Sequence, residues 1–400
     1  RRALTDRLDV SREGLVLSVT HDNYTKIVGG IQICVQVEEQ AFRDSGFTYL
    51  CLHPQQPLPE LSSIVDLSTF VFRTVLDGQD LGSVTAQTLI DVLTGLRSDV
   101  RARCLAVHSL LGHAPEIIGL LVRSASFEHS IFWVHDFFSI CPNYTLLRNR
   151  IAFCGAPPIG SNSCEICVFG TERSRHMARM NKLFAAVNFE IISPSQSALE
   201  FWRSAASVSY QSHRVVPHLE LSETGVLEPR GPNDIGEPIR IAFMGFPGAH
   251  KGWPLFARLA AELKRGRRYK FFHLGVDRQS ATNVSFIRVE TKRDDPDAMI
   301  RAMQEHRIDV AFLWSTWFET YSFTAHEAIC SGAFIVTGAQ SGNISVLAGR
   351  FNAGRVFESE AQLFAALTGG ELEKLVMERR AGEVPIYAKN FGMMSRHAVQ

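Results

Sequence analysis

The sequence predicts an α/β protein built from two successive series of parallel strands and helices. Short apolar runs alternate with longer amphipathic stretches, which is typical of parallel β/α units. A Pro- and Gly-rich segment at 217–238 separates two such series and is the best linker candidate. A chain of 400 residues with 46 % hydrophobic side chains has room for two or three domains and a sizeable core. We therefore expect two α/β domains of similar size.

The first series is expected to run from residue 15 to residue 206. Its strands are short and apolar, whereas its helices carry apolar side chains at helical spacing. The expected strands are 15–20, 48–52, 104–107, 130–134 and 190–193, and the expected helices are 31–43, 85–96 and 196–206.

The second series begins after the linker candidate with an apolar run at 239–244, broken only by Arg240. Further strands are expected at 269–274, 284–289, 309–314 and 334–337, and helices at 253–264, 297–306, 324–331 and 360–367. Ligands of open α/β sheets bind beyond the carboxyl ends of the strands. The loops that follow strands are therefore the candidates for chemistry.

Charge and composition exclude several classes of protein. Lys plus Arg and Asp plus Glu both number 41, and this zero net charge argues against a dedicated nucleic-acid binder. No stretch approaches the ~20 apolar residues that cross a bilayer. The chain opens without an apolar leader and without Met, which predicts a fragment of a cytoplasmic protein.

The first informative loop, 20–32, follows the first expected strand and contains Gly29 and Gly30. A glycine pair at a helix start allows close backbone approach by a phosphate or diphosphate. The alternative is an ordinary strand–helix turn. His21 and Asp22 lie in the same loop and are open to either interpretation.

The second loop, 244–253, contains Lys251 and Gly252 after the first strand of the second series. A lysine at a glycine-rich turn can pair with phosphate as a point charge. The glycine spacing is not that of a P-loop, and no Ser or Thr follows the lysine. The alternative is a solvated lysine on a turn.

The third loop, 315–332, carries two carboxylates beside an expected helix start. Glu319 would lie on the loop, and Glu327 would lie in the first turns of the helix. An anion could bind to the free N–H groups of Tyr321, Ser322, Phe323 and Thr324. Carboxylates beside an anion site suit a ligand with both phosphates and hydroxyls, such as a nucleotide sugar. For Glu327 alone, the alternative is a partner of the helix dipole.

This third loop resembles the donor-site signature of retaining glycosyltransferases of family 4. Glu319 and Glu327 are spaced E-x7-E within S-x-W-x-E-T-x-S-x-x-x-x-E-A-x-x-x-G, followed by an apolar strand and 341–343, Ser-Gly-Asn. Lys251, the Gly29–Gly30 loop and a strand-ending His135 fall where that family places its diphosphate lysine, its glycine loop and its first-domain histidine. The similarity is strongest over 239–358 and piecemeal over 15–200.

The resemblance implies a GT-B fold, in which two Rossmann-like domains face a central cleft. Residues 1–216 would form the acceptor-side domain with a cysteine-rich loop at 141–167, and 217–238 would form the linker. Residues 239–370 would form the donor domain, and a helical segment at 371–400 would pack back on the first domain.

The resemblance also implies a role for each matching residue. Glu327 would bind the donor ribose, and Glu319 would contact hydroxyls of the transferred sugar. Lys251 and the N–H groups near Ser322 would stabilise the leaving diphosphate without a metal. His135 would face the reacting sugar. Tyr321, Phe323 and Thr324 would help to form the donor site.

One position departs from the family pattern. The family often has Arg directly after the glycine that ends the first strand of the second domain, whereas this chain has Phe246. The phosphate contact could come instead from His250 or Arg350. The departure leaves open a weak or inactive nucleotide-sugar- or carbohydrate-binding module.

Four cysteines cluster within 27 residues as C-x12-C-x9-C-x2-C, at Cys141, Cys154, Cys164 and Cys167. Four thiolates in a loop rich in Gly and Pro could hold a structural zinc. The alternative is reduced, partly buried cysteines. The remaining four cysteines lie in apolar contexts typical of a core.

A basic amphipathic helix is expected at 172–184. Its basic side chains could touch an anionic membrane at the inner face or a phosphorylated acceptor, and the alternative is a solvated helix face.

Together these features predict a glycosyltransferase that moves a sugar from a nucleotide diphosphate sugar to a hydroxyl of a glycan or lipid-linked saccharide. The expected activity is retaining hexosyl transfer with no cofactor, for surface polysaccharide synthesis. A GT-B epimerase or phosphorylase is a second enzyme hypothesis, for which no further motif stands out.

Overall fold

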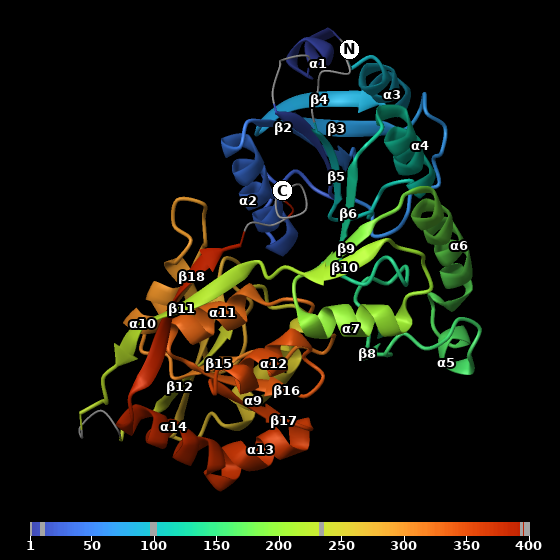
Figure 1. Ribbon diagram of the computed structural model, residues 1–400. Helices are drawn as coiled ribbons and strands as arrows, with labels where there is room; N and C mark the ends of the chain where they lie inside the picture. Colours follow the sequence, from blue (N-terminus) through green and yellow to red (C-terminus); the bar gives the residue numbers. More distant parts are fainter. Residues whose placement is uncertain (1, 9–12, 97–101, 232–235, 393–394, 396–400) are drawn as a thin grey trace. The chain divides into compact units, whose positions relative to one another are not determined.

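The computed structural model describes residues 2–8, 13–96, 102–231, 236–392 and 395 (Figure 1). The chain divides into two compact units. Unit 1 comprises Arg1–His218 with Phe391–Gln400, and unit 2 comprises Leu219–Asn390. The division falls close to the predicted end of the first domain.

Unit 1 contains a mixed sheet of eight strands in the order β10-β9-β6-β5-β1-β2-β3-β4. The six strands from β10 to β2 are parallel, and β3 and β4 continue the sheet as an antiparallel pair. The strands are β1 (Gly14–Val19), β2 (Phe47–Pro54), β3 (Val71–Leu76), β4 (Gln79–Thr85), β5 (Ala102–Val107), β6 (His129–Trp133), β9 (Glu190–Ser193) and β10 (Ser212–Val215).

The helices of unit 1 connect and cover these strands. They are α1 (Arg2–Leu8), α2 (Gly30–Asp44), α3 (Ala86–Thr94), α4 (Pro115–Ala125), α5 (Asn162–Glu165), α6 (Gly170–Ala186) and α7 (Gln196–Ala205). Helix α4 packs against both α3 and α6, and the three lie in succession along one side of the unit (Figure 1). A short hairpin of β7 (Leu147–Arg148) and β8 (Ala152–Phe153) lies in the cysteine-rich loop.

Unit 2 contains a parallel sheet of six strands in the order β14-β13-β12-β15-β16-β17. This is the order of a doubly wound Rossmann sheet, in which the third strand lies at one edge and the sixth at the other. The strands are β12 (Ile239–Met244), β13 (Tyr269–Gly275), β14 (Val284–Arg288), β15 (Val310–Phe312), β16 (Phe334–Gly338) and β17 (Gly354–Phe357). The order reverses between β12 and β15, where Ile241 pairs with Val310.

Alternate residues of β12 enter two separate cores, because successive side chains of a strand point to opposite faces. Ile239, Ile241 and Phe243 pack with α9 (Trp253–Glu262), α13 (Glu360–Gly369) and α14 (Glu371–Ala381). Ala242 and Met244 pack with α10 (Ala298–Glu305), α11 (Phe323–Ser331) and α12 (Asn343–Arg350). Helices therefore cover both faces of this sheet.

The predicted linker and C-terminal helical segment differ from the structure. Residues Leu219–Leu227 form β11, which pairs with β18 (Val384–Phe391), so most of the Pro- and Gly-rich segment belongs to unit 2. Within 371–400, α14 remains in the core of unit 2, and a strand follows where a helix was expected. Only Phe391 and later residues group with unit 1.

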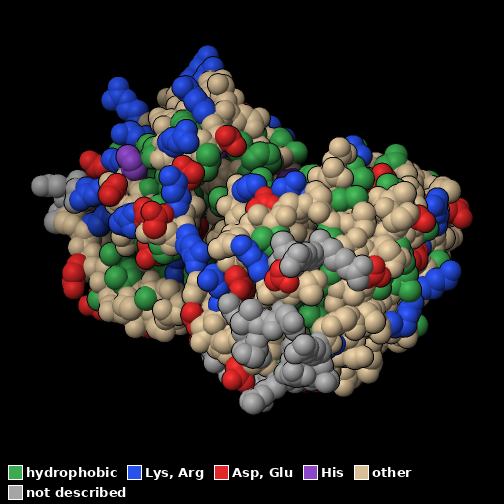
Figure 2. Space-filling model, turned by 90° about the horizontal axis from the view of Figure 1, so that it is seen from above, with side chains coloured by type: hydrophobic (Ala, Val, Ile, Leu, Met, Phe, Trp, Pro, Cys, Tyr) green, Lys and Arg blue, Asp and Glu red, His purple; other side chains and the backbone are tan. Residues whose placement is uncertain are grey.

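The surface agrees with the balanced charge of the sequence. Lys and Arg side chains are interspersed with Asp and Glu on the face in Figure 2. Among the described residues, no helix combines the length and apolar character that a membrane span requires.

Candidate functional site

The candidate site of unit 2 lies where the strand order reverses, beyond the carboxyl ends of β12 and β15. Open α/β sheets bind ligands at such switch points, because the loops diverge there and leave a crevice. The loop after β12 carries Lys251, and the loop after β15 carries Glu319. The two side chains form an ion pair, with Lys251 Nζ 2.5 Å from Glu319 Oε1. The structure thus brings together two residues that are 68 positions apart.

Lys251 ends a short 3-10 helix, Ala249–Lys251, and Gly252 fixes its position. Gly252 has a φ of +86°, and a Cβ there would lie 2.0 Å from the carbonyl oxygen of Trp314. Only glycine allows this close approach of the β12 loop to the end of β15. The Lys251 ammonium also lies 5.4 Å from the ring centroid of Trp317.

Glu319 is buried and firmly held. Its Oε1 accepts hydrogen bonds from Trp317 Nε1 at 2.8 Å and from Ser315 Oγ at 3.2 Å, besides the bond from Lys251. Its carbonyl oxygen accepts from the N–H of Asn343 at 2.8 Å. Gly342 allows this contact, because its φ is +60° and a Cβ would lie 2.5 Å from that carbonyl oxygen.

Helix α11 begins beside these side chains. Ser322 is its N-cap and accepts from the N–H of Ala325 at 3.2 Å, and the Thr324 hydroxyl lies 3.1 Å from the Ser322 hydroxyl. A helix N-terminus carries partial positive charge and N–H groups that favour anions. Lys251 adds a full positive charge to the same place.

These groups line one pocket of about 100 Å³ in unit 2. Lys251, Glu319, Ser322, Thr324 and Ser315 supply its polar side chains. The remaining lining comes from the ends of β12 and β15 and from α12, at Phe243, Met244, Gly245, Phe246, Phe312, Leu313 and Ile344. A cation, a buried carboxylate and hydroxyls around an apolar wall match a ligand that carries both phosphate and hydroxyl groups.

Three other predicted donor residues lie outside this lining. The Tyr321 hydroxyl accepts from the N–H of Leu219 at 2.8 Å and lies 3.0 Å from His326 Nε2, which ties the start of α11 to β11. The Phe323 ring packs edge-on against Tyr321. Glu327 is buried, and its Oε1 lies 3.3 Å from Lys389 Nζ on β18. Burial raises the pKa of Glu327, although Lys389 opposes this shift.

The two residues predicted to replace the missing Arg do not line the pocket. The Arg350 guanidinium lies over the ring of Phe351, 5.4 Å from its centroid. His250 packs near Trp317, and burial followed by the neighbouring Lys251 lowers its pKa, so its imidazole is neutral near pH 7. Phe246, at the Arg position, is two-thirds exposed.

In unit 1 the strand order reverses between β1 and β5, and histidines gather at this edge. His21 follows β1, His108 follows β5 and His135 follows β6. His108 Nδ1 lies 3.0 Å from His135 Nε2, and His108 Nε2 lies 3.0 Å from Glu38 Oε1 on α2. The His218 ring lies 5.1 Å from that of His135. The predicted His135 is therefore part of a buried histidine network.

Sequence reasoning missed the other members of this network. Cys34 and His218 complete a group with His135 whose ligand atoms lie within 4.8 Å of one another. Cys34 is one of the four cysteines that were expected to lie in the core, and His108 was not among the predicted site residues. Two features of the sequence could have revealed these residues. His108 directly follows a strand at the switch point, and Cys34 and Glu38 are four residues apart and so share one face of a helix.

The glycine loop of unit 1 leads into α2. Gly29 is the N-cap of α2, with an extended φ of −172° that any residue adopts. The Gln32 side chain lies close by, 2.5 Å from a Cβ built at Gly29. The Gln32 amide also lies 3.2 Å from His21 Nε2. Gly29 thus ends the loop between β1 and α2, and Gly30 is the first residue of α2, beside the strand edge that carries the histidine network.

The arrangement of strands and helices matches solved structures. The chain is similar to a sucrose-phosphate synthase from Thermosynechococcus elongatus, with a TM-score of 0.52 and 14 % identity over 92 % of this chain and 94 % of that one. It is also similar to HepE of Anabaena in complex with UDP and glucose, with a TM-score of 0.53 and 11 % identity over 92 % of each chain. The fold is GT-B, which confirms the predicted pair of Rossmann-like units. No protein-family model and no curated protein sequence matches the chain.

The zinc site predicted at Cys141, Cys154, Cys164 and Cys167 stays a prediction. Within the described residues, these sulfurs do not make a group close enough to hold a metal ion. Arg173 of α6 lies in this loop, where its buried guanidinium donates to Cys164 Sγ at 3.5 Å and to the carbonyl oxygens of Ile140 and Pro157. The loop is organised around this cation, and its cysteines are free thiols.

The predicted basic surface of α6 is also largely used inside unit 1. Arg173 and His176 are buried, and Arg179 pairs with Glu116 at 2.7 Å. Arg175 and Lys182 are exposed. The structure therefore favours the alternative of a helix that packs on the unit over a continuous basic face.

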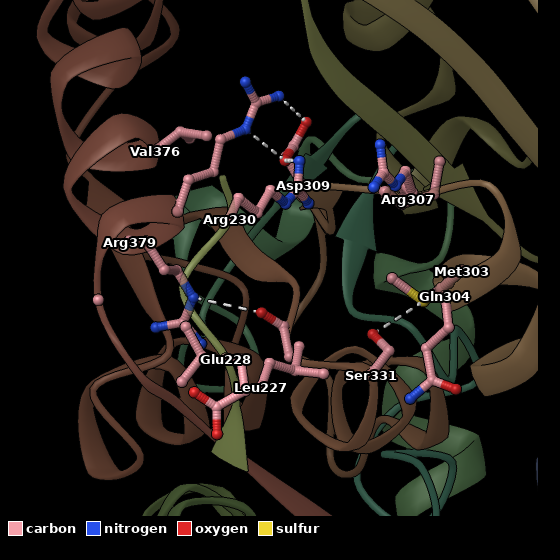
Figure 3. Close-up of a pocket in the computed structure, with 15 residues that line it drawn as sticks. Leu227, Glu228, Arg230, Met303, Gln304, Arg307, Asp309, Ser331, Val376 and Arg379 are labelled. Carbon is pink, nitrogen blue, oxygen red and sulfur yellow. Dashed lines mark hydrogen bonds and ion pairs between the residues drawn. The ribbon is translucent and has the colours of Figure 1, made fainter. Parts of the chain in front are cut away.

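A second pocket of unit 2 lies at the opposite, amino ends of the strands (Figure 3). Asp309, just before β15, is buried and pairs with Arg230 at 2.9 Å and with Arg380 at 2.6 Å. Arg380 also donates to the carbonyl oxygens of Glu237 and Pro238, and Figure 3 shows Arg379 bonded at the pocket wall. The charge of Asp309 is thus paired with those of Arg230 and Arg380, which indicates a structural role.

Proposed function

We propose that this protein is a glycosyltransferase that moves a sugar from a nucleotide diphosphate sugar to a hydroxyl acceptor. The observation that carries the proposal is the Lys251–Glu319 ion pair at the switch point of unit 2, beside the N-terminus of α11. HepE, which has the same fold, is described in complex with UDP-glucose, so UDP-sugars are the first donors to test.

The proposed chemistry follows from the charges around the pocket. Departure of a nucleoside diphosphate develops negative charge on the leaving oxygen. Lys251 and the N–H groups at the start of α11 would stabilise that charge, as preorganised donors do without reorganisation during the reaction. No resident metal is needed for this step, because the lysine and the helix supply the positive charge.

Glu319 would orient the transferred sugar. Its carboxylate is fixed by Trp317 and Ser315 and can accept hydrogen bonds from sugar hydroxyls when Lys251 turns toward the diphosphate. In the absence of donor, the ion pair keeps both side chains in the pocket. Donor binding would then require movement of the partly exposed Lys251 alone.

Glu327 would contact the ribose if the resemblance holds residue by residue. Its carboxylate is 3.3 Å from the buried ammonium of Lys389, which also donates to the carbonyl oxygen of Pro296. A ribose contact would therefore share this carboxylate with Lys389. His135 would face the sugar from unit 1, and the acceptor would be a glycan or lipid-linked saccharide.

The direct test is an assay of the full chain with a panel of nucleotide diphosphate sugars. Mass spectrometry would detect nucleotide release and glycoside formation, and NMR of the product would give its anomeric configuration. We expect release and transfer from at least one donor, with retention. Loss of turnover in Glu319→Gln, with Lys264→Ala as an exposed control, would assign it to this pocket.

The alternative proposal, a nucleotide-sugar- or carbohydrate-binding module, has the exposed Phe246 as its support. It predicts saturable donor binding with neither hydrolysis nor transfer for any donor and acceptor tested. That result would overturn the enzymatic proposal and keep the binding site.

A further inference from the structure

Unit 1 holds a buried cluster of metal-binding side chains, of which only His135 has a part in the proposed glycosyl transfer. Cys34 lies on the inner face of α2, His135 follows β6, and His218 follows β10. One ligand atom from each lies within 4.8 Å of the others. The three residues come from separate parts of the chain, so the fold itself gathers them.

The spacing is close to what a metal ion requires. A tetrahedral zinc with ligands at 2.0–2.3 Å holds its nitrogen and sulfur atoms about 3.3–3.6 Å apart. Closing the cluster from its present spacing needs side-chain movements of roughly 1 Å, within the reach of small torsional changes. A set of two imidazoles and one thiolate suits zinc among the common cellular metals.

A chain of hydrogen bonds orients one of these ligands. His135 Nε2 lies 3.0 Å from His108 Nδ1, and His108 Nε2 lies 3.0 Å from Glu38 Oε1. Metal-bound histidines usually have their second ring nitrogen held in this way, with a carboxylate at the end of the chain. Tyr49 and Ser395 hold Glu38 in turn, with the Tyr49 hydroxyl 2.8 Å from its Oε1.

We propose that Cys34, His135 and His218 bind one zinc ion in unit 1, with the fourth position left to water or another ligand. The site differs from the four-cysteine site that the sequence suggested. In this proposal His135 is a zinc ligand, and this role replaces the sugar contact proposed for it above. Zinc would tie α2 to the loop after β6 and to the chain after β10, and so would fix the edge at which unit 1 would bind a ligand.

The test measures metal rather than activity, so its failure and that of the proposed transferase are separable. The full chain, purified under reducing conditions, is incubated with Zn²⁺ and desalted, and its metal content is measured by mass spectrometry. We expect about one zinc ion per chain. Cys34→Ser and His218→Gln should each lose most of the bound zinc.

Two matched controls carry the same chemical change elsewhere. Cys104→Ser removes a buried thiol of β5 in the same unit, and Cys164→Ser removes one of the clustered thiols. Both should keep the zinc of the unsubstituted protein. Zinc lost from Cys164→Ser but retained by Cys34→Ser would place the metal in the cysteine-rich loop and overturn the proposal.

Cobalt gives a spectroscopic test that does not depend on the Cys34 variant folding. Co²⁺ in the unsubstituted protein should show a thiolate-to-cobalt charge-transfer band and a tetrahedral visible spectrum, and His218→Gln should weaken both. A protein that binds neither Zn²⁺ nor Co²⁺ under these conditions would overturn the proposal, and the cluster would then be a hydrogen-bonded core.

Discussion

The side chains at the two switch points of this molecule differ in burial and in charge. At the carboxyl edge of the unit 1 sheet, His108, His135 and Glu38 are buried and bonded to one another. At the corresponding edge of unit 2, Lys251 is partly exposed and forms a charged pair with Glu319 in an open pocket. The same topology therefore supports a buried, hydrogen-bonded network in one unit and a partly exposed, charged pocket in the other.

This difference is consistent with separate roles for the two switch points. Preorganised charge at the surface of a pocket can act on a ligand that develops charge, which fits the proposed donor site. Buried imidazoles that are hydrogen-bonded to one another and to a carboxylate suit metal binding or rigid positioning instead.

The largest effect should come from the amino edge of unit 2, where charge serves stability. Arg380→Ala removes two hydrogen bonds to the buried Asp309, at 2.6 and 2.9 Å. Breaking a buried pair costs about 3–5 kcal/mol, and chemical denaturation would measure it. The exposed pair of Arg258 and Glu360 is the control, and Arg258→Ala should change stability by less than about 1 kcal/mol. Equal effects would show that Asp309 is not an anchor of the fold.

Lys251→Ala should remove transition-state stabilisation at the carboxyl edge. We expect the transfer rate to fall about 10²–10³-fold, as when one preorganised donor is removed from an active site. Steady-state kinetics would measure the transfer rate. Lys264→Ala, on the surface of the same unit, is the control and should leave this rate unchanged. Transfer at the normal rate in Lys251→Ala would mean that the open pocket is not where charge develops.

Acid should destabilise the buried imidazoles of unit 1. Burial lowers the pKa of His176 to about 4, whereas an unfolded histidine titrates near its usual 6.5. Between these values the unfolded chain binds a proton that the folded chain does not, so stability is lost as pH falls from 6.5 toward 4. The loss is at most about 3 kcal/mol for this one group.

Melting temperatures of the unsubstituted protein and of His176→Gln across this pH range would measure the effect. Gln can still donate to the carbonyl oxygen of Phe138, which lies 2.6 Å from His176 Nε2, but it does not titrate. The melting temperature of the variant should therefore fall less than that of the unsubstituted protein as pH is lowered. An equal fall in both proteins would contradict the view that His176 is buried in its neutral form.

Gly342→Ala should disturb Glu319 through the backbone. The new Cβ would lie 2.5 Å from the Glu319 carbonyl oxygen and 2.6 Å from its nitrogen, at a φ of +60°. Such strain costs about 1–3 kcal/mol, so stability and donor affinity should both fall. Gly349→Ala on α12 is the matched control, because no atom lies within 4 Å of its Cβ, and helix stability should rise slightly.

Arg350→Ala should have the smallest effect. Its guanidinium lies over Phe351 and not in the pocket lining, so affinity for nucleoside diphosphates should change less than about twofold. Calorimetric titration would measure it. A large loss would restore Arg350 as the replacement for the missing family arginine.

Much of the fold was predictable because local patterns agree with it. The apolar run at 239–244 and the expected helix at 324–331 match β12 and α11 to within one residue. The β3–β4 pair was missed, because β4 contains exposed polar side chains and lacks the continuous apolar run of a parallel strand. Strand β11 was missed for a similar reason, since most of its residues are exposed and its partner β18 begins only at Val384, near the other end of unit 2.

For the site too, the positions of some residues followed from local sequence, whereas other contacts depend on tertiary packing. Lys251, Glu319 and Ser322 each follow a strand or cap a helix, so position along the chain placed them at one edge. The pairing of Glu327 with Lys389 and the meeting of Cys34 with His135 and His218 depend on tertiary packing between distant segments. Arg173 bonds to Cys164 within the cysteine-rich loop, which spacing alone could not show.

If unit 2 is the donor unit, its charged pocket binds a nucleoside diphosphate through Lys251. Calorimetric titration of the unsubstituted protein and of Lys251→Ala with UDP, GDP, ADP and dTDP would test this binding. We predict saturable binding of at least one of them, weakened about tenfold or more in Lys251→Ala, as expected when a charged partner is lost. Absence of binding to the folded protein, or equal affinity in the two proteins, would contradict the account.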